Sequence, residues 1–242
     1  MEQKERWEPL GKRLKILVNS EFGFGTDSLL LADFAAPKNG ENSADLGCGC
    51  GAIALLWLYR AKPGKTLAVE IQRSAVDLMR KSVKENGYED RVLVINEDIR
   101  NYKHILPHQG LDLIACNPPY FSEGLKSSNP QRNTIRHSDS LELDDLAKAA
   151  KFSLKYGGRL CICMPAFRLA YAINTLHVRG LEAKRLRLVQ STNDKPPYLF
   201  LLECRSGGKP GVEIMPTLVL NDGGLPSKEI IRIYGDYMDK ED

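Results

Sequence analysis

Short apolar runs alternate with longer amphipathic stretches along most of the chain, and short polar segments join them. The short runs are typical of buried strands, which we expect at about 43–48, 66–71, 91–97, 111–116, 159–164, 184–190 and 198–205. Helical spacing predicts helices at 51–60, 73–87, 142–156 and 167–179. This alternation predicts an α/β fold in which helices cover both faces of a seven-stranded, mostly parallel sheet.

The last two predicted strands are joined by a polar segment, residues 191–197, that is too short to hold a crossover helix. Parallel neighbours need such a crossover, so these two strands should pair antiparallel. We therefore expect one reversed strand, the last, at an edge of the sheet.

The sequence before and after the predicted core strands gives fewer indications of secondary structure. Before the first core strand we expect a short strand at 16–19 and a helix over 28–36 with Thr26 as its N-cap. After the last strand, a polar turn leads to a final helix from about Ser227 to Tyr237. A single domain is expected, with an N-terminal extension (1–42), a core (43–205) and a C-terminal turn and helix (206–242).

Composition limits the function without identifying it. With 242 residues, 43% hydrophobic and 27% charged, the chain resembles an ordinary globular domain, and its net charge of +3 is too small to indicate a nucleic-acid partner. No apolar run is long enough to cross a bilayer, and the first residues have no leader pattern. We expect a cytoplasmic protein with no membrane partner, and a monomer is favoured.

Six cysteines lie in or beside apolar runs, and none has the C-x-x-C spacing of zinc or redox sites. We interpret them as small buried hydrophobic residues. The four histidines are scattered along the chain, so no metal site is expected.

The first core strand leads directly into a glycine turn, Asp45-Leu46-Gly47-Cys48-Gly49-Cys50-Gly51-Ala52, and a predicted helix follows. Glycine allows a tight turn there and lets a ligand approach backbone N–H groups at the helix N-terminus. Gly47, Gly49 and Ala52 also satisfy the dinucleotide fingerprint, with Glu70 at a suitable separation for binding a ribose. Taken alone, the turn indicates only a cofactor that contains adenosine.

Three acids end three successive predicted strands, and their charge favours a cationic cofactor. A carboxylate such as Asp45 at the end of a buried strand is costly unless a cation or several donors accompany it. S-adenosylmethionine carries an ammonium and a sulfonium, whereas a dinucleotide pyrophosphate is anionic. We expect Glu70 to accept the ribose hydroxyls and Asp98 the adenine amino group, with Ile99 against the ring. The expected cofactor site contains Asp45, Gly47, Gly49, Gly51, Glu70, Ile71, Asp98, Ile99 and Asn117.

The fourth core strand ends in Asn117-Pro118-Pro119-Tyr120, where an amino group can be activated. An exocyclic amine is a poor nucleophile because its lone pair is delocalised into the ring. The side-chain oxygen of Asn117 and the carbonyl of Pro118 would each accept one N–H and direct the lone pair toward the methyl group. Tyr120 would stack on the base. Asn117, Pro118 and Tyr120 are therefore the predicted catalytic residues.

With these motifs in this order, the chain resembles the class I S-adenosylmethionine-dependent methyltransferases that carry an N-P-P-Y amino-methylation motif. It is most similar to the bacterial family that methylates N6 of the adenine beside the anticodon of valine tRNA. The resemblance includes residues 22–32 before the glycine turn and Arg136-His137-Ser138 after N-P-P-Y, where such enzymes often have Arg-His-Glu. It implies a Rossmann-like fold, S-adenosylmethionine as cofactor and amino methylation of a base.

A tRNA substrate, which the resemblance implies, would need an RNA-binding surface. The long polar loop after Tyr120 would lie near the target base, and it contributes the expected substrate-binding residues Pro119, Phe121, Lys126, Arg132, Arg136 and His137. Two further basic groups are candidates: Lys12, Arg13 and Lys15 near the N-terminus, and Lys184, Arg185 and Arg187 on the sixth predicted strand.

Four other functions fit parts of the pattern. Protein glutamine N5-methyltransferases use the same tetrapeptide, but they usually carry a helical domain for which the roughly 42 residues before the first core strand leave too little room. Guanine N2 methylation of rRNA would use the same amino chemistry. An NAD-dependent oxidoreductase would bind NAD instead of S-adenosylmethionine, and a non-catalytic RNA-binding module would show no turnover.

Overall fold

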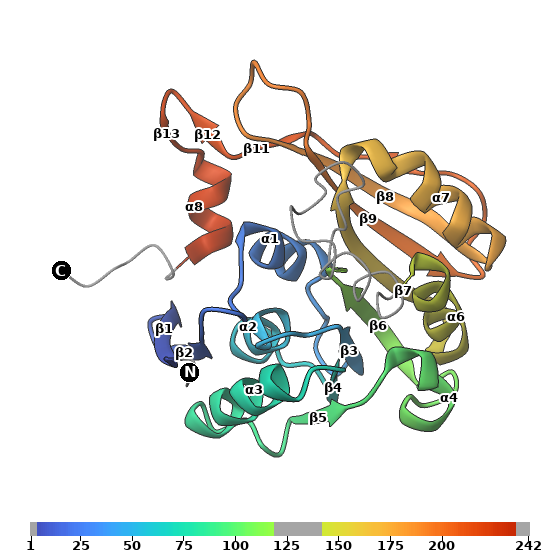
Figure 1. Ribbon diagram of the computed structural model, residues 1–242. Coiled ribbons are helices and arrows are strands. Elements are labelled where there is room, and N and C mark those ends of the chain that lie inside the picture. Colours follow the sequence, from blue (N-terminus) through green and yellow to red (C-terminus); the bar gives the residue numbers. More distant parts are fainter. Residues whose placement is uncertain (1–3, 119–141, 236–242) are drawn as a thin grey trace, which may run out of the picture.

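A central sheet organises the protein, which we describe from a computed structural model over residues 4–118 and 142–235 (Figure 1). All the predicted strands are present: β3 (Ser43–Leu46), β4 (Thr66–Glu70), β5 (Val92–Asn96), β6 (Leu111–Cys116), β7 (Leu154–Pro165), β8 (Leu181–Gln190) and β9 (Leu199–Ser206). Two short strands, β10 (Glu213–Ile214) and β11 (Leu218–Val219), pair with β8 and bring the sheet to nine strands. The sequence did not predict these two, because two-residue strands have no detectable periodicity.

The sheet order is β10-β8-β9-β7-β6-β3-β4-β5, and β9 runs antiparallel to both of its neighbours. The predicted reversed strand is therefore confirmed, but its predicted place at an edge is wrong. β9 lies inside the sheet between β7 and β8, and all but one of its residues are buried. Its nearly continuous apolar run is typical of a strand covered on both faces.

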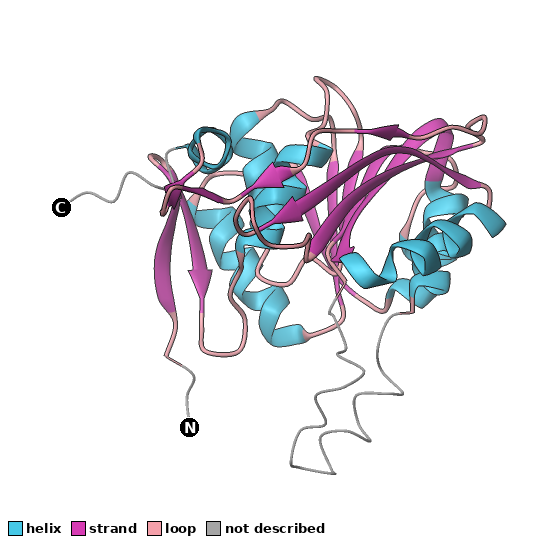
Figure 2. Ribbon diagram, turned by 90° about the horizontal axis from the view of Figure 1, so that it is seen from above, coloured by secondary structure: helices cyan, strands magenta, loops and turns pink. Residues whose placement is uncertain are grey.

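Helices cover both faces of the sheet, as expected (Figure 2). One face carries α1 (Thr26–Ala35), α2 (Ala52–Arg60) and α3 (Arg73–Glu85), and the other carries α4 (Tyr102–Ile105), α6 (Leu143–Ser153) and α7 (Leu169–Val178). β7 shows how the two cores are separated, because Cys161 and Cys163 belong to the first core while Leu160 and Ile162 belong to the second. All six cysteines are buried and none of them is in a disulfide, which confirms their interpretation as small buried residues.

An N-terminal hairpin of β1 (Arg6–Gly11) and β2 (Leu14–Val18) packs beside α3. The amide of Leu17 donates to the Ser82 hydroxyl at 2.8 Å, and the amide of Lys15 donates to the Asn86 side chain at 3.0 Å. The sequence predicted only the second strand of this hairpin. Gly25 is the N-cap of α1 and Thr26 is its first helical residue, so the predicted cap was wrong.

The C-terminal segment folds back onto α1. A small hairpin of β12 (Asn221–Asp222) and β13 (Leu225–Pro226) leads into α8 (Lys228–Tyr234), and the Ser227 hydroxyl caps this helix by accepting from the Ile230 amide at 3.2 Å. The Tyr234 hydroxyl donates to Thr26 at 3.0 Å, and Arg232 pairs with Asp33 at 2.9 Å. Tyr237, where the sequence placed the end of this helix, lies outside the described residues. Among the helices described, none has both the length and the apolarity that crossing a membrane requires.

Candidate active site

The chain goes from β3 outward to β4 and β5, and then returns to β6 on the other side of β3, so the strand order reverses there. The neighbours of β3 are β4 on one side and β6 on the other, and all three run parallel. In open α/β sheets, ligands bind in the crevice beyond the carboxyl ends of the strands at such a switch point. Asp45 of β3 pairs in register with Ala115 of β6, so Asn117 follows only two residues later at the same edge. The structure thus brings the glycine turn and Asn117 together, as the sequence predicted.

The glycine turn between β3 and α2 depends on left-handed backbone. Gly49 has a φ of 54°, and a Cβ there would meet no atom within 4 Å, so its requirement for glycine is conformational and the space above it is open. Gly51, the N-cap of α2 with a φ of 94°, would place a Cβ only 2.7 Å from the Met79 side chain. The turn therefore leaves room on its outer side and packs tightly against α3 on its inner side.

Glu70, at the end of β4, is held by backbone donors from two segments. Its side-chain oxygens accept from the amide of Gly49 at 3.0 Å and from the amide of Gln72 at 2.9 Å, and the residue is only 7% exposed. A carboxylate has about four lone-pair positions, so two such bonds leave capacity for ligand hydroxyls. The main chain thus orients this carboxylate beside the glycine turn.

Asp45 is completely buried, and one of its oxygens is unsatisfied. Its Oδ2 accepts from the Ala54 amide at 3.2 Å, while Oδ1 has no hydrogen-bond partner among the described residues. Burial raises the pKa of Asp45 to about 7; the Ala54 N–H opposes this rise and the nearby charge of Glu70 adds to it. A ligand cation would compensate both the burial and the unsatisfied oxygen, so these residues fit a cofactor that carries positive charge.

The third expected acid makes local contacts instead. Asp98 caps a short 3-10 helix (Ile99–Asn101) by accepting from the Arg100 amide at 2.8 Å, and its carboxylate also pairs with the Arg100 guanidinium. These bonds, with the Arg100 side chain as the largest cause, hold the pKa of Asp98 below its usual value. Ile71 is exposed beside Glu70, whereas Ile99 is buried in the core. An adenine ring would thus meet Ile71 more readily than Ile99.

Asn117 follows β6 and is joined to the start of α1. Its Nδ2 donates to the Ser28 hydroxyl at 3.3 Å, which holds the side-chain amide beside that helix. Pro118 is the last described residue before the gap. The other predicted acceptor-side residues lie outside the described residues: Pro119, Tyr120, Phe121, Lys126, Arg132, Arg136, His137 and Ser138.

Two residues that the sequence did not suggest lie on the acceptor side. Burial raises the pKa of Asp27, which precedes Ser28 in α1. Burial also raises the pKa of Tyr198 to about 12, with Asp27 among the neighbouring charges that add to it. The carbonyl of Tyr198 accepts from the Ala166 amide at 2.9 Å, which places Tyr198 at the end of β7. Asp27 lies inside the stretch that carries the family resemblance, and that was the only signal for it.

The two other basic groups do not line this edge. Each cation of the sixth predicted strand is bound within the protein: Lys184 to the Gly211 carbonyl at 2.7 Å, Arg185 to Glu203 at 2.9 Å and Arg187 to Glu229 at 2.6 Å. These residues stabilise the sheet and α8, so their interpretation as an RNA surface is not supported. Lys12, Arg13 and Lys15 belong to the N-terminal hairpin beside α3, away from β6 (Figure 1).

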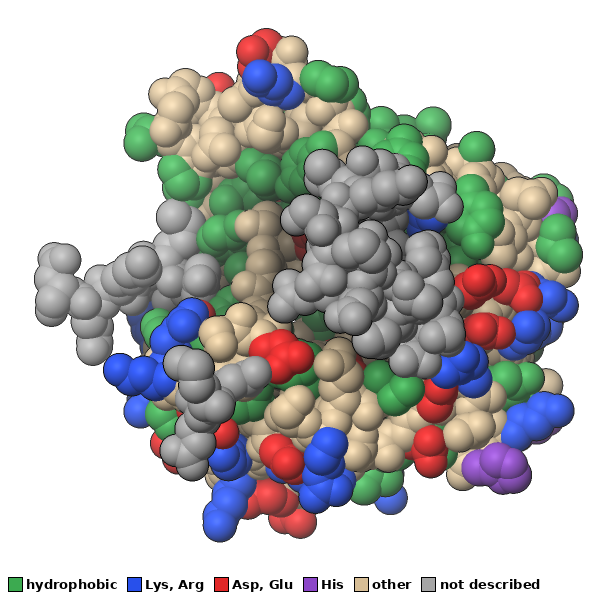
Figure 3. Space-filling view, viewed as in Figure 1, with side chains coloured by type: hydrophobic (Ala, Val, Ile, Leu, Met, Phe, Trp, Pro, Cys, Tyr) green, Lys and Arg blue, Asp and Glu red, His purple; other side chains and the backbone are tan. Residues whose placement is uncertain are grey.

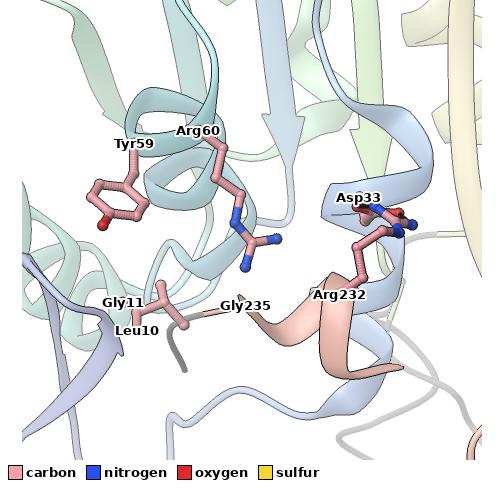
Figure 4. A pocket seen from close by; sticks show the side chains of 7 residues that line it. All are labelled: Leu10, Gly11, Asp33, Tyr59, Arg60, Arg232 and Gly235. Carbon is pink, nitrogen blue, oxygen red and sulfur yellow. Dashed lines mark hydrogen bonds and ion pairs between the residues drawn. The ribbon is translucent and has the colours of Figure 1, made fainter. Parts of the chain in front are cut away.

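A separate hollow of about 250 Å³ lies between the hairpin and helices α1, α2 and α8 (Figure 4). It is lined by Leu10, Gly11, Asp33, Tyr59, Arg60, Arg232 and Gly235. Its cations already have partners in the protein, because Arg232 pairs with Asp33 and Arg60 donates to the Tyr234 carbonyl at 3.0 Å. Neither Asn117 nor any residue of the glycine turn lines this hollow, so it is distinct from the candidate active site. Within the described residues, no group of three or more histidine, cysteine, aspartate or glutamate side chains could hold a metal ion.

Comparisons with known proteins agree with this geometry. Residues 18–173 match the methyltransferase small domain family. A "tRNA1(Val) (adenine(37)-N6)-methyltransferase" of Photobacterium profundum is 30% identical over 215 residues, which cover 88% of this chain and 89% of that protein. A protein of the same name from Bacteroides fragilis is 29% identical over 74% of this chain and 75% of that protein.

Solved structures show the same fold at low sequence identity. A predicted O-methyltransferase from Agrobacterium tumefaciens superposes with a TM-score of 0.70 at 18% identity, covering 88% of this chain and 97% of that one. TrmN from Thermus thermophilus gives a TM-score of 0.55 at 20% identity, covering 74% of this chain and 48% of that one. At such identity, the likeness concerns the fold alone.

Proposed function

The chain belongs to the methyltransferase small domain family, and we propose that it uses S-adenosylmethionine to methylate N6 of an adenine next to the anticodon of a tRNA. The observation that carries this proposal is the position of Asn117 at the carboxyl end of β6, directly beside the acids and glycines that end β3 and β4. The relatives' names supply the acceptor: they are adenine-37 N6-methyltransferases of tRNA1(Val).

The cofactor half of the site uses Glu70, Asp45 and the glycine turn. When bound, S-adenosylmethionine supplies a methyl group on a sulfonium, which makes that methyl electrophilic. Glu70, already oriented by two backbone donors, would accept the ribose hydroxyls. Asp45 would be held ionised by the positive charge of the ligand, which offsets its burial. Asp98, Ile71 and Ile99 complete the proposed adenosine side, where Asp98 shares its carboxylate with Arg100.

The acceptor half positions the amino group. The Asn117 oxygen and the Pro118 carbonyl would accept the two N–H groups of adenine N6 and favour a more tetrahedral nitrogen. Because proline has no N–H and a fixed φ, Pro118 holds the chain rigidly at this point. The N-methylated cation is very acidic, so it loses its proton without a strong general base. Tyr120, Pro119 and Phe121 would contact the base, and Lys126, Arg132, Arg136 and His137 the RNA backbone.

Two further parts of the proposal concern the protein as a whole. The hairpin β1–β2 and the helix α8 pack on the same side of the sheet as α1, α2 and α3, which supports a single domain. We further propose that this domain acts as a monomer. A tRNA substrate would place its activity in the cytoplasm.

The test is incubation of the purified protein with labelled S-adenosylmethionine and total cellular RNA, followed by digestion and nucleoside mass analysis. We expect the label in N6-methyladenosine from the tRNA fraction. Label in N2-methylguanosine, or in protein glutamine when extract replaces RNA, would contradict the substrate. A failure to bind S-adenosylmethionine by calorimetry would contradict the whole proposal.

A further inference from the structure

We propose that Phe167, Arg168 and Tyr171 form a stacking platform for the unpaired nucleotides that flank the target base in the RNA. The proposal rests on the RNA substrate proposed above. It assigns a binding surface to a part of the chain that contains none of the cofactor or amino-activating residues, namely the short 3-10 helix (Ala166–Arg168) and the first turn of α7.

The platform lies at the same edge of the sheet as Asn117. β6 and β7 are parallel neighbours, and Cys116 pairs in register with Ile162. Asn117 is therefore level with Cys163, and β7 continues for two more residues to Pro165, which is roughly 7 Å farther outward. Phe167 comes two residues after that end. The amide of Ala166 donates to the Tyr198 carbonyl at 2.9 Å, which fixes the start of the 3-10 helix against β9.

The platform exposes two aromatic side chains close together in sequence. Phe167 is 78% exposed and Tyr171 is 48% exposed, four positions apart across the junction of the 3-10 helix and α7. Hydrophobic side chains are seen on the surface over α7 in the face toward the viewer (Figure 3). A single exposed apolar residue needs no explanation, but two aromatics beside an acceptor edge offer successive flat faces for bases.

Charge indicates that the occupant is a nucleic acid. The segment 165–180 contains no aspartate or glutamate, and its two arginines have different surroundings. Arg179 pairs with Asp144 at 2.7 Å, whereas Arg168 forms no ion pair within residues 4–118 and 142–235, and its guanidinium lies 5.7 Å from the centre of the Tyr171 ring. Arg168 is therefore available to bind a phosphate, and Phe167 and Tyr171 offer faces on which bases can stack. Sites that bind single-stranded RNA combine these two kinds of side chain. A duplex stem would expose its backbone but not its base faces.

The chain offers a matched control on the opposite edge. Tyr156 is 86% exposed and lies near the amino end of β7, the strand whose carboxyl end leads into the platform. It is therefore an aromatic of comparable exposure on the same strand, separated from the platform by the length of that strand.

The test uses the full chain and two probes: a short oligouridylate, which contains no adenine to methylate, and total tRNA with labelled S-adenosylmethionine. The double variant Phe167→Ala with Tyr171→Ala should weaken oligouridylate binding by roughly 5- to 100-fold for each lost stack and raise the KM for tRNA correspondingly. Tyr171→Phe should retain binding, because it keeps the ring. Arg168→Ala should make the fall of log affinity with log salt concentration less steep, by about one unit of slope. Tyr156→Ala should bind both probes like the wild type.

Several outcomes would overturn the platform. These are equal oligouridylate affinity of wild type and double variant, no measurable oligouridylate binding by the wild type, or an equal loss in Tyr156→Ala. Cofactor affinity measured by calorimetry in every variant separates these outcomes from misfolding. If the wild type methylates protein and not RNA, the proposed function fails in its own assay, whereas a failure of the platform alone leaves tRNA methylation intact.

Discussion

The two halves of the candidate site are built by different means. At the ends of β3 and β4, the carboxylates of Asp45 and Glu70 are buried, and backbone amides of Gly49, Gln72 and Ala54 hold them. At the ends of β6 and β7, Asn117 is joined to Ser28 by a longer side-chain bond of 3.3 Å, and the aromatics beyond are exposed. The first half is preorganised by its own main chain, whereas the second depends on side chains that we propose contact the substrate.

This difference explains why the two halves should respond differently to mutation. A residue held by backbone donors affects the affinity for the group it holds, because its geometry is already set before that ligand binds. A residue that contacts the reacting amino group affects the rate, because its bonds strengthen as charge develops in the transition state. The comparison therefore separates variants that change cofactor affinity from variants that change turnover.

The largest effect should come from Asn117→Ala, which removes one of the two proposed acceptors for the amino group. We expect the rate constant for tRNA methylation, measured under single-turnover conditions, to fall by roughly 10²- to 10³-fold. Losing one transition-state hydrogen bond has an effect of this size. Cofactor affinity by calorimetry should change little. Ser28→Ala is the comparison variant, because it removes one bond to the Asn117 amide but keeps the acceptor oxygen, and it should lose less activity than Asn117→Ala. Turnover near wild type in Asn117→Ala would refute the proposed role.

The next effect should come from Glu70→Ala, which removes the proposed acceptor for the ribose hydroxyls and leaves the amides of Gly49 and Gln72 without this partner. Hydrogen bonds to charged groups contribute about 1.5–3 kcal/mol, so the Kd for S-adenosylmethionine should rise roughly 10- to 100-fold. Asp98→Ala should cost less, because its carboxylate is already shared with Arg100. Calorimetry measures the Kd for S-adenosylmethionine in both variants. A larger rise in Kd for Asp98→Ala than for Glu70→Ala would contradict this comparison.

The smallest effect, at most about tenfold per pH unit, should be the dependence of cofactor affinity on pH through Asp45. Because the pKa of Asp45 in the folded protein is about 7, above the ordinary aspartate value, a cationic ligand must favour its ionised form. Affinity should therefore rise with pH and level off above about 7. Asp45→Asn should flatten this profile, as measured by calorimetry between about pH 5.5 and 8.5.

Stability of the ligand-free protein should change in the opposite direction. The folded state binds the Asp45 proton more tightly than the unfolded state, so stability declines as pH rises from about 4 to about 7 and then stays at its lower value. Asp45→Asn should remove this decline and raise the Tm at alkaline pH. Parallel profiles for wild type and Asp45→Asn would show that the pKa of this carboxyl is not raised.

The sequence predicted the cofactor half better than the acceptor half. The glycine turn, Asp45 and Glu70 are adjacent to strand ends, so their meeting follows from the local pattern and the parallel topology. Asp98 ended a strand as predicted, but nothing in the pattern showed that Arg100, two residues later, would occupy it. Tyr198 reaches the acceptor edge only because β9 lies next to β7, a tertiary pairing that local periodicity does not contain.

The interior position of β9 also bears on how the protein is made. In the sheet, β9 lies between β7 and β8 and pairs with both, so these two strands are not joined before β9 is in place. β9 is also the last long strand to be synthesised. During translation, β7 therefore presents an open edge for as long as the ribosome needs to extend the chain past Ser206. Open edges pair readily with other chains, so this interval is when a nascent chain is most exposed to aggregation. A stall within the 191–197 loop should yield an aggregation-prone protein in which the cofactor half is complete but Tyr198 and β9, which flank the acceptor half, are missing.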